Sequence, residues 1–400
     1  MNKPKIRFKG FEGEWKERKF GDFGHVEMCK RIFKYQTSSQ GEIPFYKIGT
    51  FGFQPDAFIS RSLYEDYRKK FSYPKKGDIL ISAAGTIGRT IEYKGEECYY
   101  QDSNIVWLNH NEEIDNAYLK QLYSLVTWSS LEGATIKRLY NSNILNTHFN
   151  LPSLPEQRAL ASYFTSLDAQ IAASTSRLSS LKQIKAASLL NMFPQKGETV
   201  PRVRFKGFQG EWKEVKLSSI AIFSKGQGYS KSDLRENGHP IILYGRMYTK
   251  YQFAINEVDT FSNLKGAYVL SEGNEIIMPA SGETSEDIAC ASAVLAKGII
   301  LGGDLNIVRF DLKKYSTPFL ALTITYSKTH YDLSKCAQGK SVVHLHNEAI
   351  SKTVVSIPSL PEQRAIASYF TALDAQITLH RERLEKLKQI KAACLEKMFA

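Results

Sequence analysis

Two small groups of residues have the types and spacing that metal-assisted catalysis could use. Asp78 is followed by Glu92, Tyr93 and Lys94, which is the spacing of the acidic residue and Glu-x-Lys of metal-dependent nucleases. The stretch after Glu275 offers no second Glu-x-Lys. His344 and His346 could hold a metal ion, but their alternation is typical of a pair on the surface of a strand. Loose patterns of this kind arise by chance, so we expect neither a catalytic residue nor a metal site.

Motifs for nucleotide or methyl-transfer chemistry are absent from the sequence. It contains no G-x-x-x-x-G-K-[ST] phosphate loop and neither Asn-Pro-Pro nor Asp-Pro-Pro. Gly302-Gly303 is typical of a turn and not of a dinucleotide fingerprint. The five cysteines lie far apart, which favours neither a disulfide framework nor a zinc site. The sequence has no long apolar run and no apolar signal region after Met1, so we expect a cytoplasmic protein with no membrane partner.

Length and composition indicate a folded protein of several domains. The 400 residues predict two or three domains, and 42% hydrophobic residues suffice for real cores. Lysine and arginine exceed aspartate and glutamate by 53 to 41. This surplus suits a polyanionic partner but is spread along the chain, so charge alone decides nothing.

The strongest signal is internal duplication. Residues 4–17 recur at 201–214 with 11 of 14 identities, and residues 151–193 recur at 357–399 with 30 of 43 identities. Between these repeats the chain diverges, with weak matches of 77–81 to 273–277 and of 102–106 to 304–308. The sequence therefore predicts two related, drifting domains between two nearly identical supports.

Each support is predicted to be one long helix with a heptad seam. Pro155 and Pro361 suit the first turn of a helix, and no Gly or Pro follows in the first copy until Pro194. The apolar seam alternates in steps of three and four, and its members are Leu160, Phe164, Leu167, Ile171, Leu178 and Leu181, with Ile366, Phe370, Leu373, Ile377, Leu384 and Leu387 in the second copy. An antiparallel coiled coil of the two helices within the chain is favoured, with a coil to another protein as the alternative.

The drifting segments are predicted to be mixed α/β. Short β-rich runs at 79–82, 105–108, 241–244, 298–301 and 306–310 lie between turn residues. Trp15 and Trp212 are expected to anchor cores. The predicted fold class is α+β, with two mixed α/β domains at 1–150 and 201–356 and conserved spacer helices at 151–200 and 357–400.

Three features of the sequence carry a resemblance to a known family. They are the duplicated Pro-Ser-Leu-Pro-Glu-Gln-Arg at 152–158 and 358–364, the Gly-Asp-Ile-Leu-Ile-Ser at 77–82, and this order of parts. The chain resembles the specificity subunit of Type I restriction–modification systems over nearly its whole length. The resemblance implies two DNA target recognition domains, reading a bipartite asymmetric site, and a non-catalytic role. It also implies double-stranded DNA, two methyltransferase subunits and two restriction subunits as partners, with S-adenosylmethionine, ATP and Mg on those subunits and no cofactor on this chain. Gly273-Asn274-Glu275 departs from the Gly-Asp pattern, so the loop of the second domain could be arranged differently.

Loops that combine basic or amide side chains with hydroxyls and aromatics are the candidates for base and phosphate contacts. In the first domain these residues are Lys34, Tyr35, Gln36, Thr37, Lys47, Thr50, Thr86 and Arg89. In the second domain they are Lys225, Gln227, Tyr229, Ser230, Tyr244, Arg246, Tyr248, Lys250, Ser281, Glu283 and Thr284.

Identical residues on the two long helices are the candidates for holding partner subunits. They are Gln157, Arg158, Ser162 and Tyr163, with their copies Gln363, Arg364, Ser368 and Tyr369. Two other classes of function stay open at this stage. One is a stand-alone DNA modification or cleavage enzyme, and the other is a coiled-coil scaffold that does not bind DNA.

Overall fold

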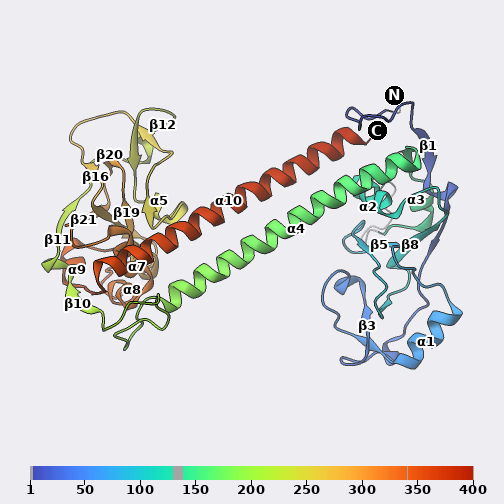
Figure 1. The fold of residues 1–400 in the computed structure, drawn as a ribbon, viewed down its shortest axis with the longest axis horizontal. Helices are drawn as coiled ribbons and strands as arrows, with labels where there is room; N and C mark the ends of the chain where they lie inside the picture. Colours follow the sequence, from blue (N-terminus) through green and yellow to red (C-terminus); the bar gives the residue numbers. More distant parts are fainter. Residues whose placement is uncertain (1–2, 129–137, 340, 400) are drawn as a thin grey trace. The chain divides into compact units, whose positions relative to one another are not determined.

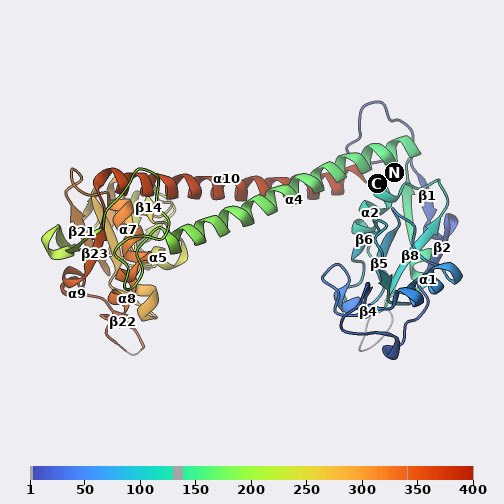
Figure 2. The same ribbon diagram turned by 60° about the horizontal axis from the view of Figure 1, so that its bottom comes forward.

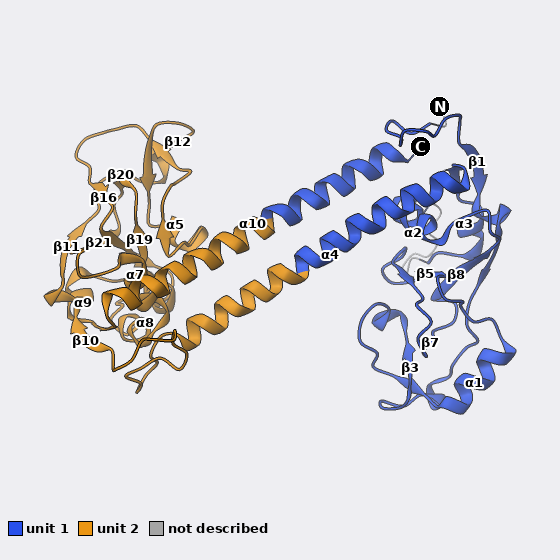
Figure 3. Cartoon of the chain, in the orientation of Figure 1, with its two compact units in different colours: residues 1–175, 382–400 blue, residues 176–381 orange. Residues whose placement is uncertain are grey.

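The computed structural model describes residues 3–128, 138–339 and 341–399. The chain divides into two compact units, one of residues 1–175 and 382–400 and the other of residues 176–381 (Figure 3). Each unit therefore holds one mixed α/β head and one part of each long helix. This division differs from the predicted boundaries, which separate heads from helices, because the helix ends pack into the cores of the heads.

The first unit contains three small sheets. Their strands are β1 (Lys16–Lys19), β2 (Gly24–Glu27), β3 (Ile43–Tyr46), β4 (Phe58–Ile59), β5 (Ile79–Ser82), β6 (Thr90–Glu92), β7 (Tyr99–Tyr100), β8 (Ile105–His110) and β9 (His148–Leu151). The helices of this head are α1 (Arg61–Lys70), α2 (Asn116–Leu125) and α3 (Asn141–Leu145).

The second unit has the same plan with additional strands. Its strands are β10 (Lys213–Lys216), β11 (Ala221–Lys225), β12 (Leu234–Arg235), β13 (His239–Ile242), β14 (Ala254–Ile255), β15 (Phe261–Ser262), β16 (Leu270–Glu272), β17 (Glu275–Pro279), β18 (Ser281–Gly282), β19 (Ser292–Val294), β20 (Lys297–Leu301), β21 (Leu305–Phe310), β22 (Val343–His344) and β23 (Val354–Ile357). Its helices are α5 (Arg246–Thr249), α6 (Ser285–Ile288), α7 (Thr317–Tyr326), α8 (Lys328–Ser334) and α9 (Asn347–Lys352).

The two heads share one topology although their sequences have diverged. The order β2-β8-β5-β6 in the first head matches β11-β21-β17-β19 in the second, and β4-β3-β7 matches β15-β13-β20. In both heads a short antiparallel pair, β1 with β9 or β10 with β23, joins the start of the head to its end. The mixed α/β class is confirmed, as are the predicted strands at 79–82, 105–108, 298–301 and 306–310. The strand predicted at 241–244 is β13, which begins earlier and ends at Ile242.

The middle strands of each central sheet, β5 and β8 in the first head and β17 and β21 in the second, are buried on both faces along most of their length. Figure 2 shows β5 and β8 side by side in the first head. In β5, Ile79 and Ile81 pack with the helices, whereas Leu80 between them packs with the smaller sheet. In β17, Ile276 and Ile277 divide in the same way between two cores. Each head is thus a stack of helices, central sheet and smaller sheet. The loops after β3 and β13 place Phe51 and Met247 in the cores, whereas most of their other side chains are exposed or half-buried.

Strand register corrects two of the sequence matches. Val26 lies opposite Leu108, and its repeat counterpart Phe223 lies opposite Val308. Residues 105–108 therefore match 305–308, a shift of two from the alignment predicted above. Leu80 lies opposite Trp107 and Ile277 opposite Ile307, which makes Asp78 the counterpart of Glu275. The carboxylate keeps its place before the strand, but the turn is arranged differently. The glycine with positive φ directly precedes Asp78 in the first head, at Gly77, and stands two residues before Glu275 in the second, at Gly273.

The supports form the two long helices α4 (Leu154–Asn191) and α10 (Leu360–Met398) (Figure 1). At 38 and 39 residues each is roughly 57 Å long at 1.5 Å per residue. Within each unit the two helices run antiparallel. In the first, Tyr163 contacts Cys394 and Asp168 contacts Lys391. In the second, Lys185 contacts Asp374 and Ser188 contacts Tyr369. The predicted seam residues are buried or half-buried throughout. The pairing of these two helices within the chain is confirmed.

A buried ion pair fixes each head to the start of a long helix, and we name this contact the junction. Arg7 binds both carboxylate oxygens of Glu156 at 2.7 Å, and Arg204 binds those of Glu362 at 2.7 Å. The remaining guanidinium protons go to the carbonyls of Gly13 and Gly210 at 2.7 Å in each case. Since both glutamates are almost completely buried, each arginine neutralises a charge that would otherwise be stranded in the core.

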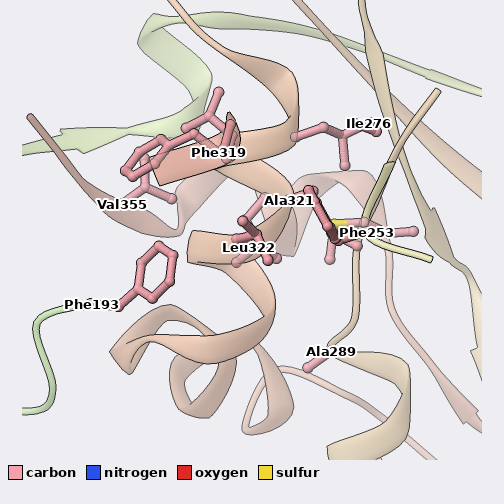
Figure 4. Close-up of a cluster of buried hydrophobic side chains, with 14 of the residues drawn as sticks. Phe193, Phe253, Ile276, Ala289, Phe319, Ala321, Leu322 and Val355 are labelled. Carbon is pink, nitrogen blue, oxygen red and sulfur yellow. The ribbon is translucent and has the colours of Figure 1, made fainter. Parts of the chain in front are cut away.

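The core beneath this junction is aromatic. In the second unit Phe193, at the end of the first support, packs on Trp212, Phe319 and Phe370 with ring centroids about 6 Å apart (Figure 4). In the first unit Phe399 occupies the equivalent place beside Trp15 at 6.4 Å. Both tryptophans are buried, so their predicted role as core anchors is confirmed.

We expect Arg204→Met to destabilise the second unit strongly. Glu362 would be left as a buried charge without a partner, which lowers the free energy of unfolding by about 3–5 kcal/mol. Hydrogen exchange in urea, read by mass spectrometry on peptides of residues 176–381, follows this unit alone, whereas tryptophan fluorescence would also report Trp15, Trp107 and Trp128 of the first unit. Arg202→Met is the matched control, because its pair with Glu198 lies nearer the surface and should leave the midpoint almost unchanged. Equal midpoints for the two variants would contradict this account of the junction.

Candidate nucleic-acid interface

In the first head, the loop that follows β3 packs against the turn between β5 and β6. We name residues 47–53 the first basic loop and residues 84–89 the first sheet turn. Arg89 donates a hydrogen bond to the carbonyl of Phe51 at 3.0 Å, and its guanidinium lies 4.9 Å from the centroid of the Phe53 ring. The structure therefore brings the predicted residues Lys47, Thr50, Thr86 and Arg89 into one place.

In the second head, the loop that follows β13 packs against the turn after β17. We name residues 244–250 the second basic loop and residues 281–284 the second sheet turn. The Tyr248 hydroxyl donates to the carbonyl of Ser281 at 2.8 Å, and the rings of Tyr244 and Tyr248 meet edge to face at 6.4 Å. A cavity of about 940 Å³ lies along this contact, and Tyr244, Tyr248, Ser281 and Glu283 are among its lining residues.

A second cavity, of about 750 Å³, adjoins the first and shares Lys231, Tyr244, Gly245 and Thr249 with it. Its other lining residues include Tyr229, Ser230, Arg246 and Lys250. Predicted residues from three separate loops of the second head thus meet on one hollowed surface. The equivalent loops of the first head carry different side chains.

The other predicted contact residues lie outside these loop pairs or at their edges. Lys34, Tyr35, Gln36 and Thr37 form a 3₁₀ turn with its end near helix α1, where Gln36 contacts the Tyr67 hydroxyl at 3.4 Å. Tyr35 is 83% exposed and stacks on Phe33. Lys225 and Gln227 are exposed beside the end of β20, and Thr284 is exposed at the tip of the second sheet turn.

Burial corrects two of the predicted contacts. The Arg246 side chain is only 7% exposed and donates to Asp259 at 2.5 Å and Gln252 at 3.0 Å. Tyr229 is buried, and its hydroxyl accepts from the backbone of Lys265 at 3.0 Å. Their polar groups are committed to holding the loops, so these two residues position the surface and are not free to read a base edge.

Two aspartates that the sequence reasoning missed hold the cations of the basic loops. Lys47 bonds Asp56 at 2.9 Å, and Lys250 bonds Asp259 at 2.5 Å. Bonds from Lys250 and then Arg246 lower the pKa of Asp259. Each aspartate opens an Asp-x-Phe triplet, 56–58 or 259–261. That shared triplet is the signal that could have identified them.

The nuclease-like pattern has a structural explanation. The Asp78 carboxylate accepts from the backbone of Lys75 at 2.7 Å, and Glu275 accepts from the backbone of Glu272 at 2.9 Å. Each closes the turn that precedes its strand, and burial raises the pKa of both carboxyls. His344 contacts the Ser281 hydroxyl at 3.2 Å. Within the described ranges, no three His, Cys, Asp or Glu side chains gather in a way that could hold a metal ion.

The helix residues predicted to bind partners fall into three groups. Gln157 and Gln363 are each 1% exposed and hold the heads, since they accept from the backbones of Asp115 at 2.9 Å and Ser316 at 3.0 Å. The prediction that they lie on a docking surface is therefore wrong. Tyr163 and Tyr369 are half-buried, with hydroxyls on Cys394 and Ser188. The exposed members are Arg158, Ser162, Arg364 and Ser368.

Comparison with known proteins places the chain in a family. The model of the Type I restriction modification DNA specificity domain matches residues 12–183 and again residues 209–389. The chain belongs to this family, and each match covers one head with its support.

Individual relatives agree with this assignment. A Haemophilus influenzae protein named as a type I restriction enzyme specificity subunit is 56% identical over 143 residues, which is 36% of this chain and 37% of that protein. The match to that relative thus spans little more than a third of its length. The MjaVIII specificity subunit of Methanocaldococcus jannaschii is 18% identical over 79% of this chain and 73% of its own. The S subunit structure from M. genitalium has the same fold, with a TM-score of 0.63 and 16% identity over 100% of this chain and 99% of that one. Among the described residues, no helix is long and apolar enough to cross a membrane.

Proposed function

We propose that the chain is the DNA-reading subunit of a Type I restriction–modification complex. In this role it recognises a bipartite, asymmetric duplex site and directs adenine methylation or restriction by its partners. One observation carries the proposal beyond family membership. Both heads present an equivalent loop pair on equivalent strands, and the side chains of these loops differ.

The chemistry of the two loop pairs supports unlike half-sites. The first basic loop and sheet turn offer lysine, threonine and arginine, which suit guanine or phosphate oxygens. The second pair adds the acidic Glu283 and the tyrosines of the cavity. A carboxylate accepts from the amino group of cytosine or adenine, so the second half-site is expected to contain such a base at the position facing Glu283.

The reactions themselves belong to other subunits in this proposal. Two methyltransferase subunits would supply S-adenosylmethionine chemistry, and two restriction subunits would supply ATP and Mg-dependent cleavage. The duplicated supports favour two equivalent docking positions, because their exposed residues Arg158 and Ser162 recur as Arg364 and Ser368. A twofold-repeated surface suits two copies of one partner.

Exchange of one head tests the proposal. We expect replacement of residues 20–147 by the head of another family member to change one half of the methylated site and to leave the other half intact. Both exchange points lie beside the β1–β9 pair, so the junction with the support is kept. Methylome sequencing of cells with this chain and its methyltransferase gives the site directly. Alteration of both halves would contradict two independent heads, and a chain that directs no methylation would contradict the proposed function.

Charge reversal tests the docking surface. We expect Arg158→Glu to remove one bound methyltransferase subunit and Arg158→Glu with Arg364→Glu to remove both, as counted by native mass spectrometry. The control is Arg381→Glu with Lys386→Glu, since these exposed residues of α10 have the uncharged counterparts Thr175 and Ser180 in α4. Two subunits held with unchanged affinity by the double variant would refute this docking surface.

A further inference from the structure

The aspartates Asp56 and Asp259 occupy the same place in the two heads. In the first head Pro44 of β3 lies opposite Phe58 of β4, and in the second Pro240 of β13 lies opposite Phe261 of β15. At the next residue of β3 and β13, Phe45 donates to the carbonyl of Ala57 at 2.8 Å, and Ile241 donates to that of Thr260 at 3.0 Å. Each aspartate directly precedes this bond, so the two carboxylates are equivalent by strand register.

Both carboxylates bind a cation of the basic loop, but the cations stand at different positions of the two loops. Asp56 binds Lys47, which begins the first basic loop. Asp259 binds Arg246, the first residue of α5, and Lys250, which follows that helix and ends the second basic loop. The chain has drifted here beyond alignment, yet each head has kept an aspartate on the cation of its basic loop. Random drift in a loop would not be expected to keep this pairing.

The exposure of the carboxylates indicates what they do. Asp56 is 58% and Asp259 is 61% exposed, while Lys47 and Lys250 are 42% and 54% exposed. Pairs this exposed add little to stability. A negative group at the rim of a DNA-reading surface also repels phosphates and thus opposes affinity. It can, however, improve discrimination, because specificity is the difference between two affinities and repulsion of the wrong complex contributes to it.

We propose that Asp56 and Asp259 are positioning residues that set selectivity by holding Lys47 and Lys250 away from the DNA backbone in non-specific complexes. This inference rests on the proposed DNA-reading function. Each aspartate acts on the half-site of its own head. In the second head Asp259 also orients the buried Arg246, which holds the basic loop in shape.

Salt dependence gives a direct readout of this role. Each lysine that newly contacts a phosphate makes the slope of log K against log salt steeper by about 0.9. We expect Asp56→Asn and Asp259→Asn each to add about 0.9 to the slope on duplex DNA that lacks the recognised site, and the double variant about 1.8. Their non-specific affinity at low salt should rise several-fold, and sequence preference should relax only in the half-site of the altered head.

Lysine variants separate this role from a structural one. Lys250→Met alone should leave the non-specific slope unchanged, because Lys250 is already neutralised by Asp259. The same change in the Asp259→Asn chain should abolish the added slope. Lys47→Met should behave in the same way with Asp56→Asn. A loop that had only lost its shape would respond to neither lysine change in this pattern.

The measurements use the full chain assembled with its methyltransferase subunits, whose own contribution to the slope is common to all variants. Glu348→Gln is the matched control, since it removes one negative charge from an exposed ion pair on α9. This helix packs in the core with α7 and α10 and not with the basic loops. Two results would overturn the inference: salt slopes unchanged in both aspartate variants, or sequence preference relaxed in both half-sites by a single aspartate change. In either case a wild-type complex that still prefers its recognised site would uphold the proposed function. A wild-type complex with no salt-dependent, site-preferring binding would instead overturn the proposed function, and the inference with it.

Discussion

Two glutamates, Glu156 and Glu362, lie almost completely buried in the first turn of the long helices, and the rest of each unit is arranged around their neutralisation. A carboxylate so far from water is tolerated only beside an opposite charge with good geometry. Arg7 and Arg204 supply that charge from the segments that precede each head. This requirement explains why residues 4–17 and 201–214 have stayed nearly identical, since the arginine, the carbonyls it binds and the tryptophan beneath must all be kept together.

Above this junction the constraint on sequence is of a different kind. The central strands of each head are buried on both faces, so apolar character is required but a particular residue is not. Leu80 and Trp107 fill the first head where Ile277 and Ile307 fill the second. The loops after β3 and β13 each contribute one fully buried apolar residue to these cores, Phe51 or Met247, and most of their other side chains are exposed or half-buried. A fold with fixed supports and permissive cores can therefore change the residues of its reading surface without changing the frame that presents them.

Sequence reasoning succeeded where periodicity or repetition carried the signal. The seam of the long helices, the central strands and the buried tryptophans follow from apolar spacing and from duplication. It failed where a polar residue is buried. Gln157 and Gln363 look like surface residues in a helix, but they satisfy the backbone of Asp115 and Ser316. Arg246 and Tyr229 were predicted as contacts because of their chemistry, and only the fold shows that their polar groups are used internally. Register also escaped the sequence, since matching Ile105 with Ile307 by likeness of residues misplaced the strand by two positions.

The loop pairs of the two heads have diverged in sequence, but in each one an aspartate still neutralises a cation of the basic loop. A surface that offers cations to DNA binds all DNA, because phosphates are alike at every site. The more lysine and arginine a reading loop carries, the more its affinity comes from the backbone and the less from the bases. In both heads the cation that begins or ends the basic loop is held by an aspartate that lies two residues before the neighbouring strand, although the loops themselves have no alignable sequence. The Asp-x-Phe triplet can stay constant because its phenylalanine begins that strand. The loop can drift because it only has to return one cation to the carboxylate. The division between fixed frame and variable reader, evident in the whole chain, is thus repeated inside each head.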